Sequence, residues 1–138
     1  MDTTGTVEKT ETVPINNDSD VVTVRQRVRA WTMEMKFSII DQTRIVTAAS
    51  ELARNALEHG GGGSVELALL IQGVRRGIRM SFSDRGPGIP DVALALKDGY
   101  STGEGMGLGL GGSKRLMNEF DIKTHIGGGT TVTAIRWK

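Results

Sequence analysis

Apolar residues recur at helical spacing in the first half of the chain. They stand three or four positions apart, at Val21, Val24, Val28, Trp31 and Met35. This spacing predicts a helix with one buried face and with Asp20 as its N-cap. A second helix is predicted to begin after Ser38 or Asp41 and to run through "QTRIVTAASELARNALEH" until Gly60 ends it.

Short β-like runs replace the helical spacing further along the chain. "SVELALLIQ" (64–72) and "GIRMSFSD" (77–84), joined by the turn-like "GVRR", predict a hairpin. "DIKTHI" and "TTVTAIRW", separated by three glycines, predict a second hairpin. Between them, "VALALKDG" predicts a short helix. "GLGGSKRLMNEF" predicts another helix that packs through Leu110, Leu116, Met117 and Phe120.

The N-terminal residues lack such patterns. Residues 1–11 are polar and threonine-rich, which predicts a flexible tail, and leave 12–138 as a single domain. "TVPIN" at 12–16 predicts a short strand, which Pro14 confines to a sheet edge because proline has no N–H. Helices combined with antiparallel strand pairs predict the α+β class. We expect a two-layer α/β sandwich, in which helices cover a mixed, mostly antiparallel sheet.

Composition excludes several classes of protein. With 138 residues the chain has the size of one domain, and 17 basic against 16 acidic residues provide no broad surface for nucleic acid or an anionic membrane. Cysteine is absent, which excludes disulfide scaffolds and thiolate metal sites. The longest mainly apolar run, at 65–71, is too short to span a membrane, and the N-terminus has no apolar core of a signal peptide. A soluble, cytoplasmic domain is expected.

The segment "ELARNALEH" carries the first candidate chemistry. Glu51 and Asn55 stand four residues apart, so a helix projects them from one face. A carboxylate there can take a proton from a nucleophile, and a carboxamide oxygen suits Mg²⁺. Two alternatives remain at this point: a solvated polar stripe, or a metal site made of Glu51, Asn55 and His59.

The segment "DRGPGIP" carries the second group of candidate functional residues. Asp84 follows a predicted strand where the backbone turns, and Gly86 and Gly88 leave the space beside it bare enough for a flat ring. An ionised aspartate only accepts hydrogen bonds, so it suits an exocyclic amine such as that of adenine. The alternative is an ordinary aspartate–glycine turn.

The stretch "GEGMGLGLGG" (103–112) has a glycine at almost every second position. It satisfies G-x-G-x-x-G, but so dense a run matches many patterns, and no acidic residue or βαβ unit follows at the required distance. A Walker loop is excluded because "GGSKR" has the wrong order. A glycine lid over phosphates, leading into a helix N-terminus, is the remaining interpretation.

Together, "ELARN", "DRGPGIP", "GMGLGL" and "GGTTV" resemble, in order and spacing, the N, G1, G2 and G3 boxes of the GHKL (Bergerat-fold) ATPase superfamily. Within it the chain is similar to the anti-sigma serine/threonine kinases, and most of all to their switch-kinase branch in stress signalling. "DQTRIVTAASELARN", "DGYSTGEGMGLGLGGSKRLMNEF" and the final "AIRW" carry this closer likeness, which covers nearly all of residues 18–138.

The resemblance implies a role for each matching residue. Glu51 matches the catalytic base, Asn55 the Mg²⁺ ligand, and Asp84 the carboxylate that reads adenine. The remaining matches shape the site: the adenine wall at Gly86 and Gly88, the phosphate lid at Gly105, Gly107 and Gly109, and a hydroxyl that assists Asp84 at Thr130. Lys114 and Arg115 either reach phosphate or are solvated.

The resemblance also implies the reaction. It implies a kinase that uses ATP and Mg²⁺ to phosphorylate a serine or threonine of a STAS-domain partner, with a PP2C-type phosphatase as a second partner. No helix with a phosphoacceptor histidine is seen, which disfavours an autophosphorylating histidine kinase. An ATP-dependent anti-sigma factor or binding module with incidental catalysis remains the alternative.

Overall fold

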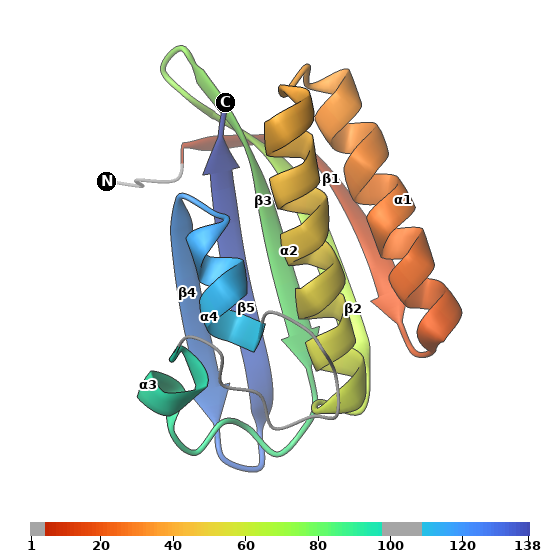
Figure 1. Cartoon of the computed structure of the whole chain (residues 1–138), viewed down its shortest axis with the longest axis vertical. Coiled ribbons are helices and arrows are strands. Elements are labelled where there is room, and N and C mark those ends of the chain that lie inside the picture. Colours follow the sequence, from red (N-terminus) through yellow and green to blue (C-terminus); the bar gives the residue numbers. More distant parts are fainter. Residues whose placement is uncertain (1–4, 98–108) are drawn as a thin grey trace.

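One sheet and a layer of helices form the structure (Figure 1). The computed structural model describes residues 5–97 and 109–138. Its elements, in chain order, are β1 (Thr6–Ile15), α1 (Asp18–Glu34), α2 (Ile39–Glu58), β2 (Gly63–Gln72), β3 (Arg75–Asp84), α3 (Val92–Ala95), α4 (Gly109–Arg115), β4 (Glu119–His125) and β5 (Gly129–Trp137).

The strands form a single five-stranded sheet in the order β1-β2-β3-β5-β4. Every neighbouring pair of these strands is antiparallel, so the sheet of the described residues is antiparallel throughout rather than mixed. The α1, α2 and α4 helices cover one face of it (Figure 1). The predicted α+β sandwich is therefore confirmed, and so are both hairpins, β2–β3 and β4–β5.

The predicted N-terminal tail is wrong over most of its length. β1 has ten residues and begins at Thr6, and it pairs with β2 along its length except at an irregularity in register between Val7 and Lys9. Most of these residues are exposed, and only Val13 and Ile15 at the C-terminal end are buried in the core. The N-terminal half of the strand therefore depends on its pairing with β2 rather than on burial. The strand lies at the edge of the sheet, as Pro14 predicted.

Side-chain caps fix the starts of both long helices. Asn17, and not Asp20, is the N-cap of α1: its side chain accepts a hydrogen bond from the Asp20 N–H at 3.0 Å. Ser38 caps α2 in the same way, accepting from the Asp41 N–H at 3.1 Å. Both caps satisfy backbone donors that have no partner within the helix.

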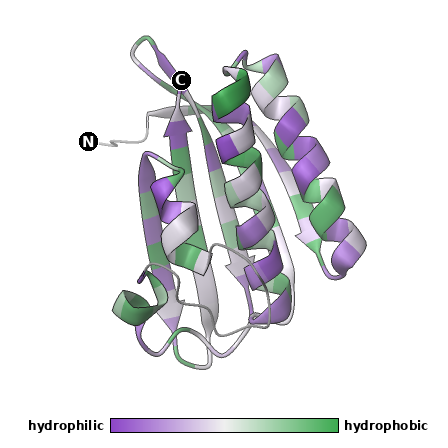
Figure 2. Ribbon diagram, viewed as in Figure 1, coloured by the Kyte–Doolittle hydropathy of each residue, from purple (hydrophilic) through white to green (hydrophobic). Residues whose placement is uncertain are grey.

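The buried core lies between the sheet and the helices. Apolar and polar residues alternate along α1 and α2 (Figure 2), and their apolar faces carry buried residues such as Val28, Trp31, Ile45 and Leu52. These pack against Val65, Leu67, Ile78, Met80 and Phe82 of the central strands.

A polar cluster joins β1 to α1. The Glu11 carboxylate accepts two hydrogen bonds from the Arg27 guanidinium, at 2.7 and 2.9 Å, and one from the Trp31 indole N–H at 2.7 Å. The hydrogen bonds from Arg27 lower the pKa of Glu11 from 4.5 to about 2, with smaller contributions from Trp31 and from the charges of Arg27 and Lys9, against an opposing effect of burial. The edge strand is thereby fastened to the helix layer.

The α4 helix is shorter than the sequence predicts. It ends at Arg115, and Phe120 lies in β4 rather than on a helix face. Leu116 and Phe120 still pack against the core, so the apolar pattern reflects burial and not helical geometry.

Within the described part of the chain, no helix is long and apolar enough to cross a membrane.

Candidate functional site

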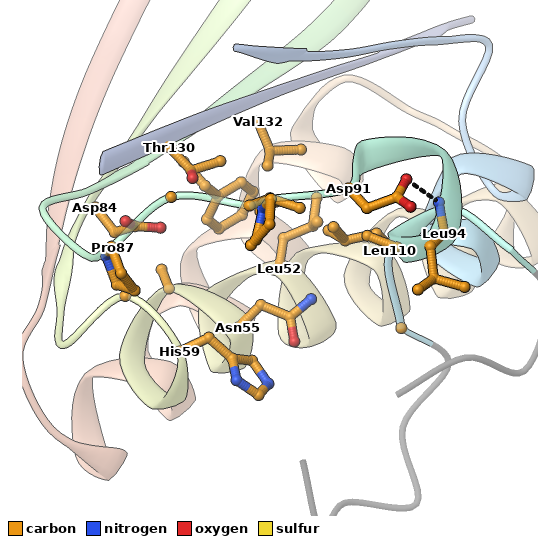
Figure 3. Close-up of a pocket in the computed structure, with 18 residues that line it drawn as sticks. Leu52, Asn55, His59, Asp84, Pro87, Asp91, Leu94, Leu110, Thr130 and Val132 are labelled. Atoms are coloured by element: carbon orange, nitrogen blue, oxygen red, sulfur yellow. Dashed lines mark hydrogen bonds between the residues drawn. The ribbon is translucent and has the colours of Figure 1, made fainter. Parts of the chain in front are cut away.

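A cavity of about 400 Å³ opens between α2 and the sheet at the end where β3 terminates (Figure 3). Leu52, Asn55, Ala56 and His59 line it from α2, because positions three and four apart share one face of a helix. Figure 3 shows Asn55 on this helix side and Asp84, Thr130 and Val132 on the sheet side. Gly60, just after α2, and Phe82 of β3 also line it. The remaining walls come from the loop after β3, from α3 and from the start of α4: Pro87, Gly88, Ile89, Pro90, Asp91, Leu94, Ala95, Gly109 and Leu110.

Most of the cavity wall is apolar, and the polar groups are few. Such a surface suits a flat, largely apolar ring that is oriented by a small number of hydrogen bonds. The sequence indicated Asn55, His59, Asp84 and Thr130, but neither Asp91 nor apolar members such as Ile89, Leu94 and Val132. No spacing marks them as wall residues, since Ile89 lies in a loop and Leu94 is exposed, and only the fold shows that they border a cavity.

Asp84 is the last residue of β3, and its side chain lines the cavity. One carboxylate oxygen, Oδ1, accepts a hydrogen bond from the Gly86 backbone N–H at 2.9 Å. This turn fixes the carboxylate at the strand end and leaves Oδ2 to face another donor. The interpretations of this segment as a turn and as a binding residue are thus compatible.

Thr130 is the cross-strand partner of Asp84 in the β3–β5 pair. The Thr130 side chain is buried, and its hydroxyl lies 2.9 Å from that of Thr124, either of which can donate. Thr124 also accepts a hydrogen bond from the Ile89 N–H at 2.9 Å. Strands β4 and β5 therefore hold the loop that forms one wall of the cavity.

Close backbone contacts require glycine at several positions around Asp84. A Cβ at Gly88, where φ is +86°, would lie 2.5 Å from the carbonyl oxygen of His125. A Cβ on Gly86 would lie 2.6 Å from the Cα of Gly60. Sequence reasoning assigned Gly60 only the end of a helix, and it missed that contact because the two segments are far apart in the chain.

The structure does not bring all predicted site residues into the cavity. Glu51 lies one helical turn before Asn55, half-buried, and is outside the residues that line the space. Gly109 begins α4 and lines the cavity, whereas Gly105 and Gly107 lie outside the described residues. Lys114 and Arg115 are exposed in the last turn of α4 and do not line it.

His59 ends α2 as its C-cap and donates its backbone N–H to the Asn55 carbonyl oxygen at 3.0 Å. Over residues 5–97 and 109–138, no group of three or more His, Cys, Asp or Glu side chains is arranged to hold a metal ion. Of the three residues of the alternative metal site, Asn55 and His59 line the cavity and Glu51 does not.

Comparison with known proteins relates the chain to a family of ATPases. Residues 40–138 match the family model described as histidine kinase-, DNA gyrase B- and HSP90-like ATPase. The chain is 42% identical over 125 residues to the serine/threonine-protein kinase RsbT of Bacillus subtilis, covering 91% of this chain and 94% of that protein. It is 29% identical over 119 residues to the anti-sigma F factor of Anoxybacillus flavithermus, covering 81% and 80% respectively.

Solved structures show the same architecture. The RsbU and RsbW domains of a Mycobacterium tuberculosis protein match with a TM-score of 0.65 and 25% identity, covering 95% of this chain and 33% of that one. The catalytic domain of the histidine kinase ThkA matches with a TM-score of 0.55 and 18% identity, covering 91% and 95%. The second likeness concerns the fold alone.

Proposed function

Because the chain belongs to the histidine kinase-, DNA gyrase B- and HSP90-like ATPase family, in its serine/threonine-protein kinase branch, we propose that it phosphorylates a serine or threonine of a STAS-domain partner. ATP is the phosphoryl donor, and the reaction belongs to a partner-switching pathway that controls a sigma factor. One observation carries the site assignment. Asn55, Asp84 and Thr130, which come from three elements, line one cavity with apolar walls.

Asp84 selects the base in this proposal. Its Oδ1 is occupied by the Gly86 N–H, so Oδ2 is the oxygen that accepts the exocyclic amine of adenine. Thr130 stands directly across the β3–β5 pair and provides a hydroxyl on the same side. The apolar walls between Leu52 and Val132 bury the ring.

Asn55 is the proposed Mg²⁺ ligand. Its carboxamide oxygen is of the hard type that Mg²⁺ prefers, and this ion commonly takes one or two protein ligands together with substrate phosphates. The donor set of the cavity fits that pattern, because the described residues offer the Asn55 oxygen but no cage of several carboxylates. When bound, Mg²⁺ offsets the charge of the phosphates.

Glu51 is the proposed general base. It precedes Asn55 by one turn on α2 and is outside the residues that line the cavity. In the transfer step, the partner's hydroxyl oxygen bonds to the γ-phosphorus as the bond to the β-phosphate oxygen breaks. The hydroxyl proton goes to the Glu51 carboxylate, and ADP leaves.

A second function is supported by the similarity to anti-sigma F factors. In that case ATP sets the shape of a docking surface, and a PP2C-type phosphatase or a sigma factor is the bound partner. The two functions share the nucleotide cavity and differ in whether phosphate leaves it.

Incubation with γ-labelled ATP, Mg²⁺ and a STAS-domain protein encoded beside this chain separates the two functions. We expect label on a serine or threonine of the STAS protein, and transfer that is slower by ~10²–10⁴ when Glu51 is replaced by alanine. A complex that forms with ATP but transfers no label would support the binding module instead.

A further inference from the structure

Gly60 is the first residue after the C-cap of α2 and lies against the Asp84 side chain. A Cβ built on Gly60 would lie 2.6 Å from Asp84 Oδ2 and closer still to Asp84 Cγ and Cβ. Atoms that are not bonded do not approach so closely. The position of the carboxylate therefore depends on the absence of a side chain at residue 60.

We propose that Gly60 determines base specificity as a positioning residue for Asp84. This inference rests on the proposed role of Asp84 in reading adenine. Because Gly60 has no side chain, the Asp84 carboxylate has room beside it. In this position Oδ1 accepts a hydrogen bond from the Gly86 N–H, and Oδ2 remains for another donor. Any larger residue must rotate the Asp84 side chain or separate α2 from the loop.

Other contacts hold α2 against the loop after β3, so the two cannot easily separate. Gly60 is buried, and its N–H donates to the Asn55 carbonyl oxygen at 3.3 Å. On the loop side, Gly86 approaches the Gly60 backbone so closely that a Cβ on it would lie 2.6 Å from the Gly60 Cα. The two glycines thus pack backbone to backbone, and they join the helix that carries Asn55 to the turn that carries Asp84.

The need for glycine at this position comes from space and not from backbone conformation. Gly60 is not among the residues with positive φ, so alanine fits its backbone. Its neighbour Gly61 is the reverse case: φ is +71°, and a Cβ there meets nothing within 4 Å. Gly61→Ala strains the backbone beside α2 without touching Asp84, which makes it the matched control for Gly60→Ala.

The test measures ATP and GTP affinity for the wild type, Gly60→Ala, Gly61→Ala, Asp84→Asn and the Gly60→Ala/Asp84→Asn double variant. We expect Gly60→Ala to weaken ATP binding about as much as Asp84→Asn, roughly 5- to 150-fold, and to remove the preference for ATP over GTP. The double variant should bind no worse than Asp84→Asn alone, since both act on one contact. Gly61→Ala should keep the wild-type preference.

A second readout needs no nucleotide. In the nucleotide-free chain, the Gly86 amide proton should shift upfield in Gly60→Ala, because it loses the hydrogen bond to Asp84 Oδ1, and should not shift in Gly61→Ala. If Gly60→Ala does not fold, Gly60→Ala/Asp84→Gly removes the three atoms in collision and should fold. A double variant that stays unfolded would place the collision elsewhere and overturn the inference.

The outcomes separate this inference from the proposed function. Wild-type nucleotide preference and an unshifted Gly86 amide in Gly60→Ala, together with a loss of preference in Asp84→Asn, would overturn the role of Gly60 alone. Equal binding of ATP and GTP by the wild type would instead remove the proposed role of Asp84, and with it the specificity role of Gly60.

Discussion

Asp84 and Thr130 stand directly opposite each other where β3 and β5 pair, at the end of the sheet that borders the cavity. The two residues are 46 positions apart in the chain, and the β3–β5 register alone brings them together. The sheet therefore presents a carboxylate and a hydroxyl side by side, next to the apolar residues Phe82 and Val132 of the same cavity wall.

This group predicts the base preference. Asp84→Asn should bind ATP about 5- to 150-fold more weakly, because an unpaired buried polar contact costs about 1–3 kcal/mol, and should lose its preference over GTP. Titration calorimetry with both nucleotides measures the effect. Asp91→Asn is the control: Asp91 also lines the cavity, but it caps α3, and asparagine caps helices equally well.

Glu51 and Asn55 should separate catalysis from binding. Glu51→Ala should still bind Mg·ATP while phosphoryl transfer falls by ~10²–10⁴, as is typical when a general base is lost. Asn55→Ala should weaken both binding and transfer. Single-turnover transfer to the STAS partner gives the rate, and Glu58→Ala, an exposed carboxylate on the same helix, should match the wild type. An unchanged transfer rate in Glu51→Ala would contradict the role of general base and leave Glu51 as a solvated residue on the helix surface.

The Glu11 cluster predicts how stability depends on pH. Because the folded-state pKa of Glu11 is depressed from 4.5 to about 2, its contribution is present above pH 4.5 and is lost as the pH falls towards 2. Glu11→Gln should lower the free energy of unfolding by about 1–2 kcal/mol at pH 7 and flatten this acid-side slope. Urea titrations between pH 2 and 7 measure both effects.

The matched control is Glu8→Gln. Glu8 pairs with Arg76 at 3.3 Å, but both side chains are more than half exposed. Its removal should change stability little at any pH. Equal acid-side slopes for the wild type and Glu11→Gln would contradict the assignment.

Replacing Gly111 of α4 by alanine should destabilise the protein, although helix propensity alone favours alanine. Alanine in a helix interior is normally favoured over glycine by about 1 kcal/mol. A Cβ on Gly111, however, would collide with the carbonyl oxygen of Leu96 and lie 3.0 Å from its carbon. Gly111→Ala should therefore lower the melting temperature and loosen α3 against the cavity, at a cost of about 1–3 kcal/mol. A raised melting temperature would contradict this prediction, because it would show that the Leu96 backbone moves aside at little cost. Lys114→Ala is the control: Lys114 is exposed in the same helix, so its replacement should leave the melting temperature unchanged.

The elements that bury one face could be predicted from the sequence, and those held by hydrogen bonds could not. Helices α1 and α2 and both hairpins follow from the spacing of their apolar residues. Most of β1 was missed because an exposed edge strand such as Thr6–Ile15 needs no apolar alternation. Phe120 was assigned to a helix because a few apolar residues over a short range fit both periods.

The candidate site shows the same division. Asn55 and Asp84 were found through local motifs, and the structure brings them to one cavity. The positioning contact of Gly60 depends on a segment 24 residues away, which no local pattern encodes. The sequence shows which residues are apolar, but it does not show that they border a cavity, because the cavity forms only when the fold brings them together.

The edges of the sheet determine how a protein partner can attach. At β1, the irregular register between Val7 and Lys9 and the missing N–H of Pro14 interrupt the row of backbone groups that an added strand would need. At β4, the outward residues Glu119, Asp121 and Lys123 place charges along the other edge. Extension of the sheet by an incoming chain is thus discouraged on both sides. Recognition therefore falls to side chains on the surface, where point substitutions can redirect it without disturbing the backbone.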